Sequence, residues 1–234
     1  MSDFFGGIAQ AARLILTLDP DLAEITLLSL RVSLMATLIA SLIGLPLGAW
    51  LAINRFPARR TVIALLNGLM GLPPVVVGLF VYVLLSRSGP LGVLGLLFTP
   101  TAMVIAQVII ITPIIASIAH QAIRELWADY HDLLISLGAT RRQRLITLIV
   151  DGQRPMLTAS LAGFGRGIGE VGAIMIVGGN IDHATRVLTT AISLETGKGD
   201  FEMALALGLI LITLAISVNL VLHTLNRTER GSRW

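Results

Sequence analysis

Long apolar stretches separated by short polar connections dominate the pattern of this chain. Five such stretches cover residues 26–53, 61–86, 101–123, 156–181 and 203–226. Each exceeds the ~20 residues that cross a hydrocarbon core of ~30 Å. Backbone groups find no water inside a bilayer, so each stretch must be helical. The pattern predicts an all-α fold, a polytopic membrane helix bundle with five transmembrane helices.

Four prolines lie inside these stretches, and we expect them to break or kink the helices. Pro46, Pro73, Pro74 and Pro113 each remove one backbone hydrogen bond from a helix. Helix ends freed near Pro73 and Pro74 make the pair a candidate gate. A static kink is the alternative interpretation.

The composition supports a membrane protein and excludes several classes of site. Apolar residues make up 55% of the chain and charged residues 13%, whereas soluble domains are about 25% charged. The absence of cysteine excludes disulfides, thiolate metal sites, iron–sulfur clusters and cysteine nucleophiles. The 4 histidines show no metal-ligand spacing. We therefore expect neither a bound metal nor a cofactor.

Basic residues gather in the connections between alternate stretches, which predicts the orientation. One group comprises Arg55, Arg59, Arg60, Arg124, Arg141, Arg142, Arg144, Arg154, Arg227, Arg230 and Arg233. The other connections carry only Arg13, Arg87, Arg186 and Lys198. The positive-inside rule places the richer group in the cytoplasm, with the N-terminus outside and the C-terminus inside. Short clusters that flank apolar stretches also argue against a nucleic-acid surface.

The two ends of the chain lie outside the predicted bundle. Residues 1–26 form an N-terminal periplasmic or interfacial segment, and residues 225–234 form a cytoplasmic tail. The first residues lack the basic start and cleavage site of a secretory signal. Within them, residues 4–18 are either an amphipathic interfacial helix or an apolar tail.

The longest cytoplasmic connection, residues 124–155, has a helical pattern of its own. Its leucines and isoleucines recur at helical spacing, and Gly138 interrupts them. A helix, a glycine turn and a second helix are expected. Such a hairpin either docks on a partner or packs against the cytoplasmic end of its own bundle.

This hairpin resembles the EAA loop of ABC-importer permeases. Asp132 takes the place of the acidic residue, Gly138 has the right spacing, and Arg154-Pro155 matches the end of the loop. Leu133 and Leu134 replace two alanines, and Asp151 replaces the loop proline. The resemblance covers residues 27–224, a type I importer permease domain with its coupling loop at 126–155.

A second region is similar to oxyanion permeases. The segments 165–173, 177–181 and 185–192 resemble molybdate permeases. Gly165-Arg166, Glu195-Thr196 and the segment 198–201 look most like tungstate permeases. The resemblance implies import of an oxyanion, tungstate first, with molybdate, sulfate or another solute as alternatives.

The resemblance also implies partners and roles. It implies a homodimer of two permease copies in the cell inner membrane, with two cytoplasmic ATPase subunits and an extracellular binding protein. The chain has no Walker A motif, so ATP hydrolysis must come from another chain. The resemblance implies that this chain is a transport subunit and not an enzyme, with ATP and Mg²⁺ bound by the partner ATPase. The ATPase-coupling residues would be Asp132, Leu137, Gly138, Ala139, Thr140, Arg141, Arg154 and Pro155.

Two charges inside the fourth stretch are further candidates. Arg166 and Glu170 are spaced so that they can pair on one helix face. Arg166 either attracts an anion in the path or only orders the bundle through the pair. With His120 the same charges would serve a multi-span membrane enzyme, the alternative from another class. Asn180 and Arg186 would meet the loaded binding protein on the outer side.

Small residues recur every four positions along the same stretch. One row is Ala159, Gly163 and Gly167, and a second is Gly165, Gly169 and Ala173. Such rows allow close helix approach. Homodimer contact, pore lining and packing within one subunit all remain open.

Overall fold

The computed structural model of the chain describes residues 19–230, and these residues are all-helical. The predictions for residues 4–18 and for the last residues of the tail lie outside this part. The helices are α2 (Pro20–Ile53), α3 (Arg59–Leu69), α4 (Pro74–Leu85), η1 (Gly92–Leu94), α5 (Pro100–Ser136), α6 (Arg141–Asp151), α7 (Gln153–Ile168), α8 (Gly172–Gly178), α9 (Leu188–Lys198) and α10 (Phe201–Arg230).

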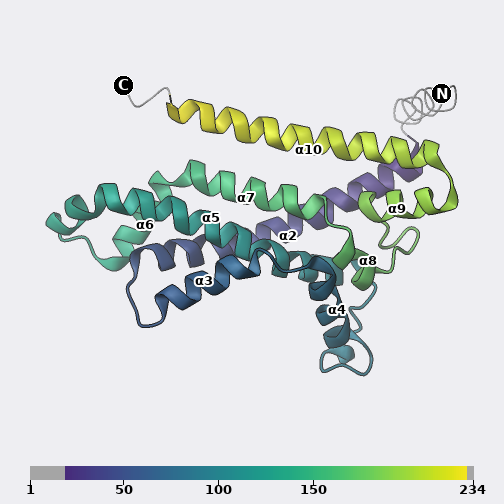
Figure 1. The fold of residues 1–234 in the computed structure, drawn as a ribbon, viewed down its shortest axis with the longest axis horizontal. Coiled ribbons are helices and arrows are strands. Elements are labelled where there is room, and N and C mark those ends of the chain that lie inside the picture. Colours follow the sequence, from purple (N-terminus) through teal and green to yellow (C-terminus); the bar gives the residue numbers. More distant parts are fainter. Residues whose placement is uncertain (1–18, 231–234) are drawn as a thin grey trace.

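Every predicted apolar stretch corresponds to one helix or to one bent helix pair. The helices α2, α5 and α10 are long and apolar enough to cross a membrane. The pairs α3–α4 and α7–α8 bend by 98° and 62°, and counting each pair as one span gives 5 crossings. The start of α2 and the end of α10 lie at opposite ends of the bundle (Figure 1). That arrangement fits an odd number of crossings.

The core of the bundle is the close, parallel packing of α2 on α5. Gly48 of α2 lies so near α5 that an added Cβ would overlap the carbonyl oxygen of Ala116. A Cβ on Gly44 would lie 3.1 Å from the carbonyl oxygen of Thr112. Because Gly44 and Gly48 are one helical turn apart, as are their partners, the two helices keep a constant separation.

One row of small residues in α7 packs within the subunit. Ala159 is fully buried among Ile111 and Ile115 of α5. Added Cβ atoms on Gly163 and Gly167 would lie 2.7 Å and 2.8 Å from the Ile111 side chain. This row therefore brings α7 against α5, which answers the question that the sequence left open for it.

Two of the four prolines lie at a break between helices, and the other two lie within continuous helices. Pro73 and Pro74 stand at the N-cap and the first position of α4, where α3 and α4 are separated. Pro46 and Pro113 lie inside α2 and α5, which continue through them. Proline removes only one helix hydrogen bond, and the α2–α5 packing on both sides of these positions holds the helices together.

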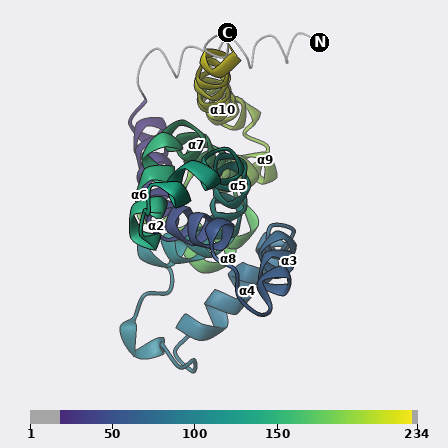
Figure 2. The ribbon, with the colours of Figure 1, turned by 90° about the vertical axis from the view of Figure 1, so that its left-hand side faces the viewer.

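The predicted hairpin forms, with its first helix continuous with the third span. The helix α5 runs on to Ser136, Gly138 has a φ of +66°, and α6 begins at Arg141. The hairpin, the α2–α3 connection and the end of α10 lie at the same end of the bundle (Figure 1), which faces the viewer in Figure 2. We call it the hairpin end. The members of the richer basic group that lie within residues 19–230 are therefore gathered at this end.

Candidate functional site

The two bent helix pairs meet near their breaks. Gly78 of α4 packs on α8 so closely that an added Cβ would lie 2.7 Å from the Cα of Ala173. A Cβ on Gly172, the first residue of α8, would lie 2.7 Å from Cγ2 of Val75. The ends of broken helices expose unpaired backbone groups. Their meeting point is therefore where the bundle needs polar side chains.

Glu170 supplies several of these polar contacts between α7 and α8. Arg166 Nη1 donates to Glu170 Oε2 at 2.6 Å. The backbone N–H of Ala173 donates to Glu170 Oε1 at 3.2 Å, at the start of α8. The Glu170 side chain is 4% exposed and that of Arg166 is 37% exposed. The predicted ion pair thus forms, and it spans the break instead of lying on one continuous helix.

Neighbouring helices complete this arrangement. Gln107 Nε2 of α5 donates to the carbonyl of Gly167 at 2.8 Å and lies 3.5 Å from Ser33 Oγ of α2. Thr189 Oγ1 of α9 donates to the carbonyl of Glu170 at 2.8 Å. We call this group of five residues the central polar cluster. Its members are Ser33, Gln107, Arg166, Glu170 and Thr189.

The central polar cluster holds helices together. Both oxygens of Glu170 accept hydrogen bonds, one of them from Nη1 of Arg166. His120 is not part of the cluster, because its buried Nε2 has no hydrogen-bond partner within the described residues. The enzyme-like grouping of His120 with Arg166 and Glu170 is therefore not assembled.

The segment after α8 forms a tight turn that carries Asn180 and Arg186. Gly179 and Asn180 have φ values of +71° and +51°, a left-handed conformation that glycine and asparagine tolerate best. Thr185 Oγ1 donates to the carbonyl of Gly178 and accepts from the N–H of Ile181. The buried Thr185 hydroxyl thus closes the turn and directs Arg186 toward α9.

Beside this turn lies a broad cleft with a basic lining. We call it the outer basic cleft because it lies at the end of the bundle opposite the hairpin end. It measures about 750 Å³ between the turn, α8 and α9, and its polar lining comes from Asn180, Arg186, Ser193 and Lys198. The buried Nε of Arg186 has no hydrogen-bond partner within the described residues. Arg186 Nη1 pairs with Asp182 at 2.7 Å, and Lys198 pairs with Glu195 at 2.9 Å. The cleft therefore offers hydrogen-bond donors whose positive charge is partly neutralised by neighbouring carboxylates.

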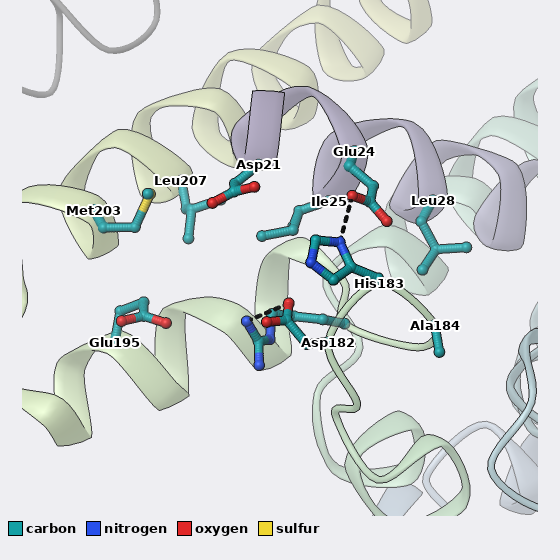
Figure 3. Close-up of a pocket in the computed structure, with 11 residues that line it drawn as sticks. Asp21, Glu24, Ile25, Leu28, Asp182, His183, Ala184, Glu195, Met203 and Leu207 are labelled. Atoms are coloured by element: carbon teal, nitrogen blue, oxygen red, sulfur yellow. Dashed lines mark hydrogen bonds and ion pairs between the residues drawn. The ribbon is translucent and has the colours of Figure 1, made fainter. Parts of the chain in front are cut away.

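A smaller acidic cavity of about 60 Å³ lies on the other side of the same turn. Figure 3 shows His183 pointing from the turn to Glu24 of α2, and Nδ1 and Oε2 are 2.9 Å apart. This hydrogen bond, with the charges of Glu24, Asp182 and Asp21, raises the pKa of His183 above its ordinary value. The contact links the turn to the beginning of α2. Within residues 19–230, no cluster of His, Asp or Glu is arranged to hold a metal ion.

The predicted coupling residues lie around the hairpin tip at the opposite end. Leu137 is 71% exposed, and Gly138 has open space around its Cα. Thr140 caps α6, with its side chain accepting from the N–H of Gln143. Arg144 Nε donates to the carbonyl of Ala139 at 2.7 Å. The tip is thus a well-ordered turn that presents apolar side chains outward.

The remaining predicted residues are more dispersed. Arg141 is exposed at the start of α6, the Asp132 side chain is fully exposed, and Arg154 and Pro155 lie in the first turn of α7. Pro73 is exposed beside the break between α3 and α4. The structure therefore gathers Arg166 with Glu170 and Asn180 with Arg186, at two separate places.

The sequence analysis missed Gln107, Thr189, Ser193 and Lys198 as site residues. Gln107 carried a usable signal, since a glutamine inside an apolar span needs a polar partner. Thr189 and Ser193 carried none, because hydroxyl residues are common in helices of every kind. Lys198 stood out as the single lysine of the chain.

Comparisons with known proteins agree with this architecture. The family described as "Binding-protein-dependent transport system inner membrane component" matches residues 44–231. The "Tungstate uptake system permease protein TupB" of Peptoclostridium acidaminophilum is 39% identical over 94% of this chain and 96% of its own length. TupB of Campylobacter jejuni is 36% identical over 96% and 94%. A structure of the MetNI methionine ABC transporter has a TM-score of 0.71 at 18% identity, covering 92% of this chain and 97% of its own chain.

Proposed function

The chain belongs to the family of binding-protein-dependent transport system inner membrane components, and from that premise we propose that it carries tungstate across the membrane. It is a multi-pass inner membrane permease of an ABC importer, and it does not itself catalyse a reaction. Permeases of this family act with ATPase subunits and a binding protein. The membrane-enzyme alternative is therefore wrong.

The outer basic cleft is the observation that carries the proposal. A doubly charged tetrahedral oxyanion needs N–H and O–H donors, and Asn180, Arg186, Ser193 and Lys198 line one cleft. The positive charges of Arg186 and Lys198 are partly neutralised by Asp182 and Glu195. This partial neutralisation suits the passage of an anion. Conduction requires a site that attracts an ion and still releases it. The two TupB relatives support tungstate as the particular anion.

The hairpin tip is the proposed docking site of the ATPase. Leu133, Ile135 and Leu137 are 54%, 48% and 71% exposed, beyond the apolar part of α5. Exposed apolar side chains on an ordered turn are typical of a protein contact. The hairpin end is then cytoplasmic, and the outer basic cleft faces the binding protein. Because α5 is continuous into the hairpin, a movement of the tip reaches the core as a rigid-body motion.

A second copy of the chain completes the proposed importer. The helix α4 exposes Val76, Leu79, Phe80 and Val83, each more than half exposed. The helix α4 itself projects away from the α2–α5 core (Figure 1). We assign it to a homodimer contact that places the two bent pairs of each copy beside a shared path.

Reconstitution tests the substrate directly. The permease, its ATPase and the binding protein are placed in liposomes, and tungstate uptake and ATP hydrolysis are measured with tungstate-, molybdate- or sulfate-loaded binding protein. We expect stimulation by the tungstate-loaded form. Stimulation by another loaded form alone would reassign the anion, and the absence of any stimulation would contradict the importer complex as proposed.

Variants of the cleft test the site. Arg186→Gln removes a donor with an estimated loss of about tenfold in tungstate uptake, the size of one charged hydrogen bond. Arg87→Gln is the matched control, because Arg87 is exposed on another outer connection and does not line the cleft. Equal uptake by the Arg186 and Arg87 variants would exclude the cleft from the path.

A further inference from the structure

A second polar cavity lies at the hairpin end, between the end of α2 and the start of α6, at the opposite end of the bundle from the outer basic cleft. It measures about 420 Å³, within the ~300–1,000 Å³ usual for small-ligand pockets. Three segments meet there. They contribute Asn54 and Arg55 after the end of α2, Trp127 and His131 of α5, and Arg141 and Arg144 of α6. None of these residues lines the outer basic cleft, and Arg141 is also one of the predicted coupling residues.

The lining has three guanidinium groups and no carboxylate. Within the described residues, the side chains of Arg55 and Arg141 make no hydrogen bond or ion pair. Arg144 is anchored through Nε to the carbonyl of Ala139. His131 lies in the wall and is paired with Asp132 at 2.9 Å, whose own side chain is fully exposed outside the cavity. Arg55 and Arg141 are exposed, so their guanidinium groups are free to bind an anion.

The geometry of the donors selects the class of anion. A guanidinium presents a planar fork of N–H groups that matches phosphate-type oxyanions. The cavity also opens at the first turn of α6, where backbone N–H groups and the helix dipole favour negative charge. Arginines from the α2–α3 connection and from α6 approach it from two sides. A phosphate group is therefore the chemistry that this cavity fits.

The position of the cavity at the end of a membrane-crossing helix indicates the source of the phosphate. It begins directly after Ile53, where the membrane-crossing helix α2 ends. Trp127 lies in the wall, in edge contact with His131 at 4.8 Å between ring centroids. Trp50, one turn before the end of α2, is 44% exposed. Tryptophan and arginine at the end of a span mark the headgroup region of the bilayer.

We propose that this cavity binds the phosphate headgroup of an anionic phospholipid. Basic pockets between transmembrane helices are known to hold such headgroups. The headgroup would join the α2–α3 connection to the start of α6 through Arg55 and Arg141. The lipid thereby stabilises the position of the hairpin relative to α2. A free phosphate-type anion would use the same donors, and the experiment distinguishes the two sources.

The test uses the complex of the permease with its ATPase, purified in detergent. Native mass spectrometry counts retained phosphatidylglycerol and phosphatidylcholine, and a parallel thermal melt is recorded with inorganic phosphate alone. The variants are Arg55→Gln, Arg55→Lys and the control Arg60→Gln, since Arg60 is exposed on α3 and does not line the cavity. Equal melting temperatures without lipid establish that the variants fold.

We expect selective retention of phosphatidylglycerol by the unmodified complex. Arg55→Gln should lower that retention about tenfold, the size of one charged hydrogen bond, and Arg55→Lys should lower it less. Arg60→Gln should retain the lipid as before. Equal retention of the two lipids, or no effect of Arg55→Gln, would overturn the proposal. Stabilisation by inorganic phosphate with no lipid retained would assign the cavity to a free anion and overturn the lipid.

Discussion

Arg166 and Glu170 form an ion pair of 2.6 Å across the break between α7 and α8, and Glu170 also accepts from the N–H of Ala173. One carboxylate therefore fixes both the end of one helix and the beginning of the next. The two charges pair with each other at the break. This pair explains how a span can be broken at its centre without a proline.

Glu170→Ala should destabilise the protein strongly. It leaves Arg166 without its partner and α8 without its acceptor, and breaking a buried pair costs about 3–5 kcal/mol. A thermal melt of the purified complex should show a large decrease in melting temperature. The control is Glu125→Ala, because Glu125 is exposed on α5. Similar melting temperatures for the two variants would contradict the structural role of the pair.

Two glycine substitutions should have opposite effects. Gly48→Ala forces α2 away from the Ala116 backbone of α5, and overpacking of this kind costs about 1–3 kcal/mol. Gly208→Ala has open space around it in α10, and alanine stabilises a helix over glycine by about 0.5–1 kcal/mol. Melting temperatures should fall for the first variant and stay level or rise for the second. A fall of the same size in both would contradict the close α2–α5 contact.

Substitution of Gly138 at the hairpin tip should distinguish an effect on coupling to the ATPase from an effect on folding. Its φ of +66° disfavours any side chain, with a cost of about 1–2 kcal/mol, yet nothing lies within 4 Å of an added Cβ. Gly138→Arg should therefore insert and fold but lose stimulation of the ATPase by loaded binding protein. Gly138→Asn, which tolerates this conformation, should keep it. Normal stimulation in Gly138→Arg would disprove docking at the tip.

The contact between His183 and Glu24 should depend on pH. The pKa of His183 is raised from 6.5 by Glu24, Asp182 and Asp21, so the folded state holds the proton more tightly than the unfolded state. The stabilisation is complete below pH 6.5 and is lost as the pH rises through the raised pKa. Both groups are largely exposed, so the effect is modest.

Amide hydrogen exchange in the turn 181–186 measures this contact. Protection, corrected for the intrinsic exchange rate, should be greater at acidic than at alkaline pH. The variant His183→Gln should remove that difference, whereas His131→Gln, at the other end of the bundle, should leave it unchanged. A difference that persists in His183→Gln would assign the pH dependence to another group.

The hydrophobic pattern by itself determined the class of the protein and the limits of its spans. A bilayer permits only helices, and a span must have a minimum length, so apolar stretches such as 101–123 identify helices without any knowledge of their neighbours. The hairpin could also be predicted from local sequence, because the spacing of its leucines and a glycine at position 138 define two helices and a turn. The predicted pairing of Arg166 with Glu170 also followed from their spacing alone.

The arrangement of these parts was decided by tertiary structure. The row of small residues at every fourth position indicated that α7 packs closely, but only the contacts with Ile111 showed that its partner is α5 of the same subunit. The helices α2 and α5 continue through Pro46 and Pro113, because the packing of α2 on α5 offsets the loss of a single backbone hydrogen bond. Gln107 and Thr189 reach the break from distant positions of the chain. Contacts between distant segments leave no trace in local periodicity, so the central polar cluster and both basic cavities emerged only once the helices were packed.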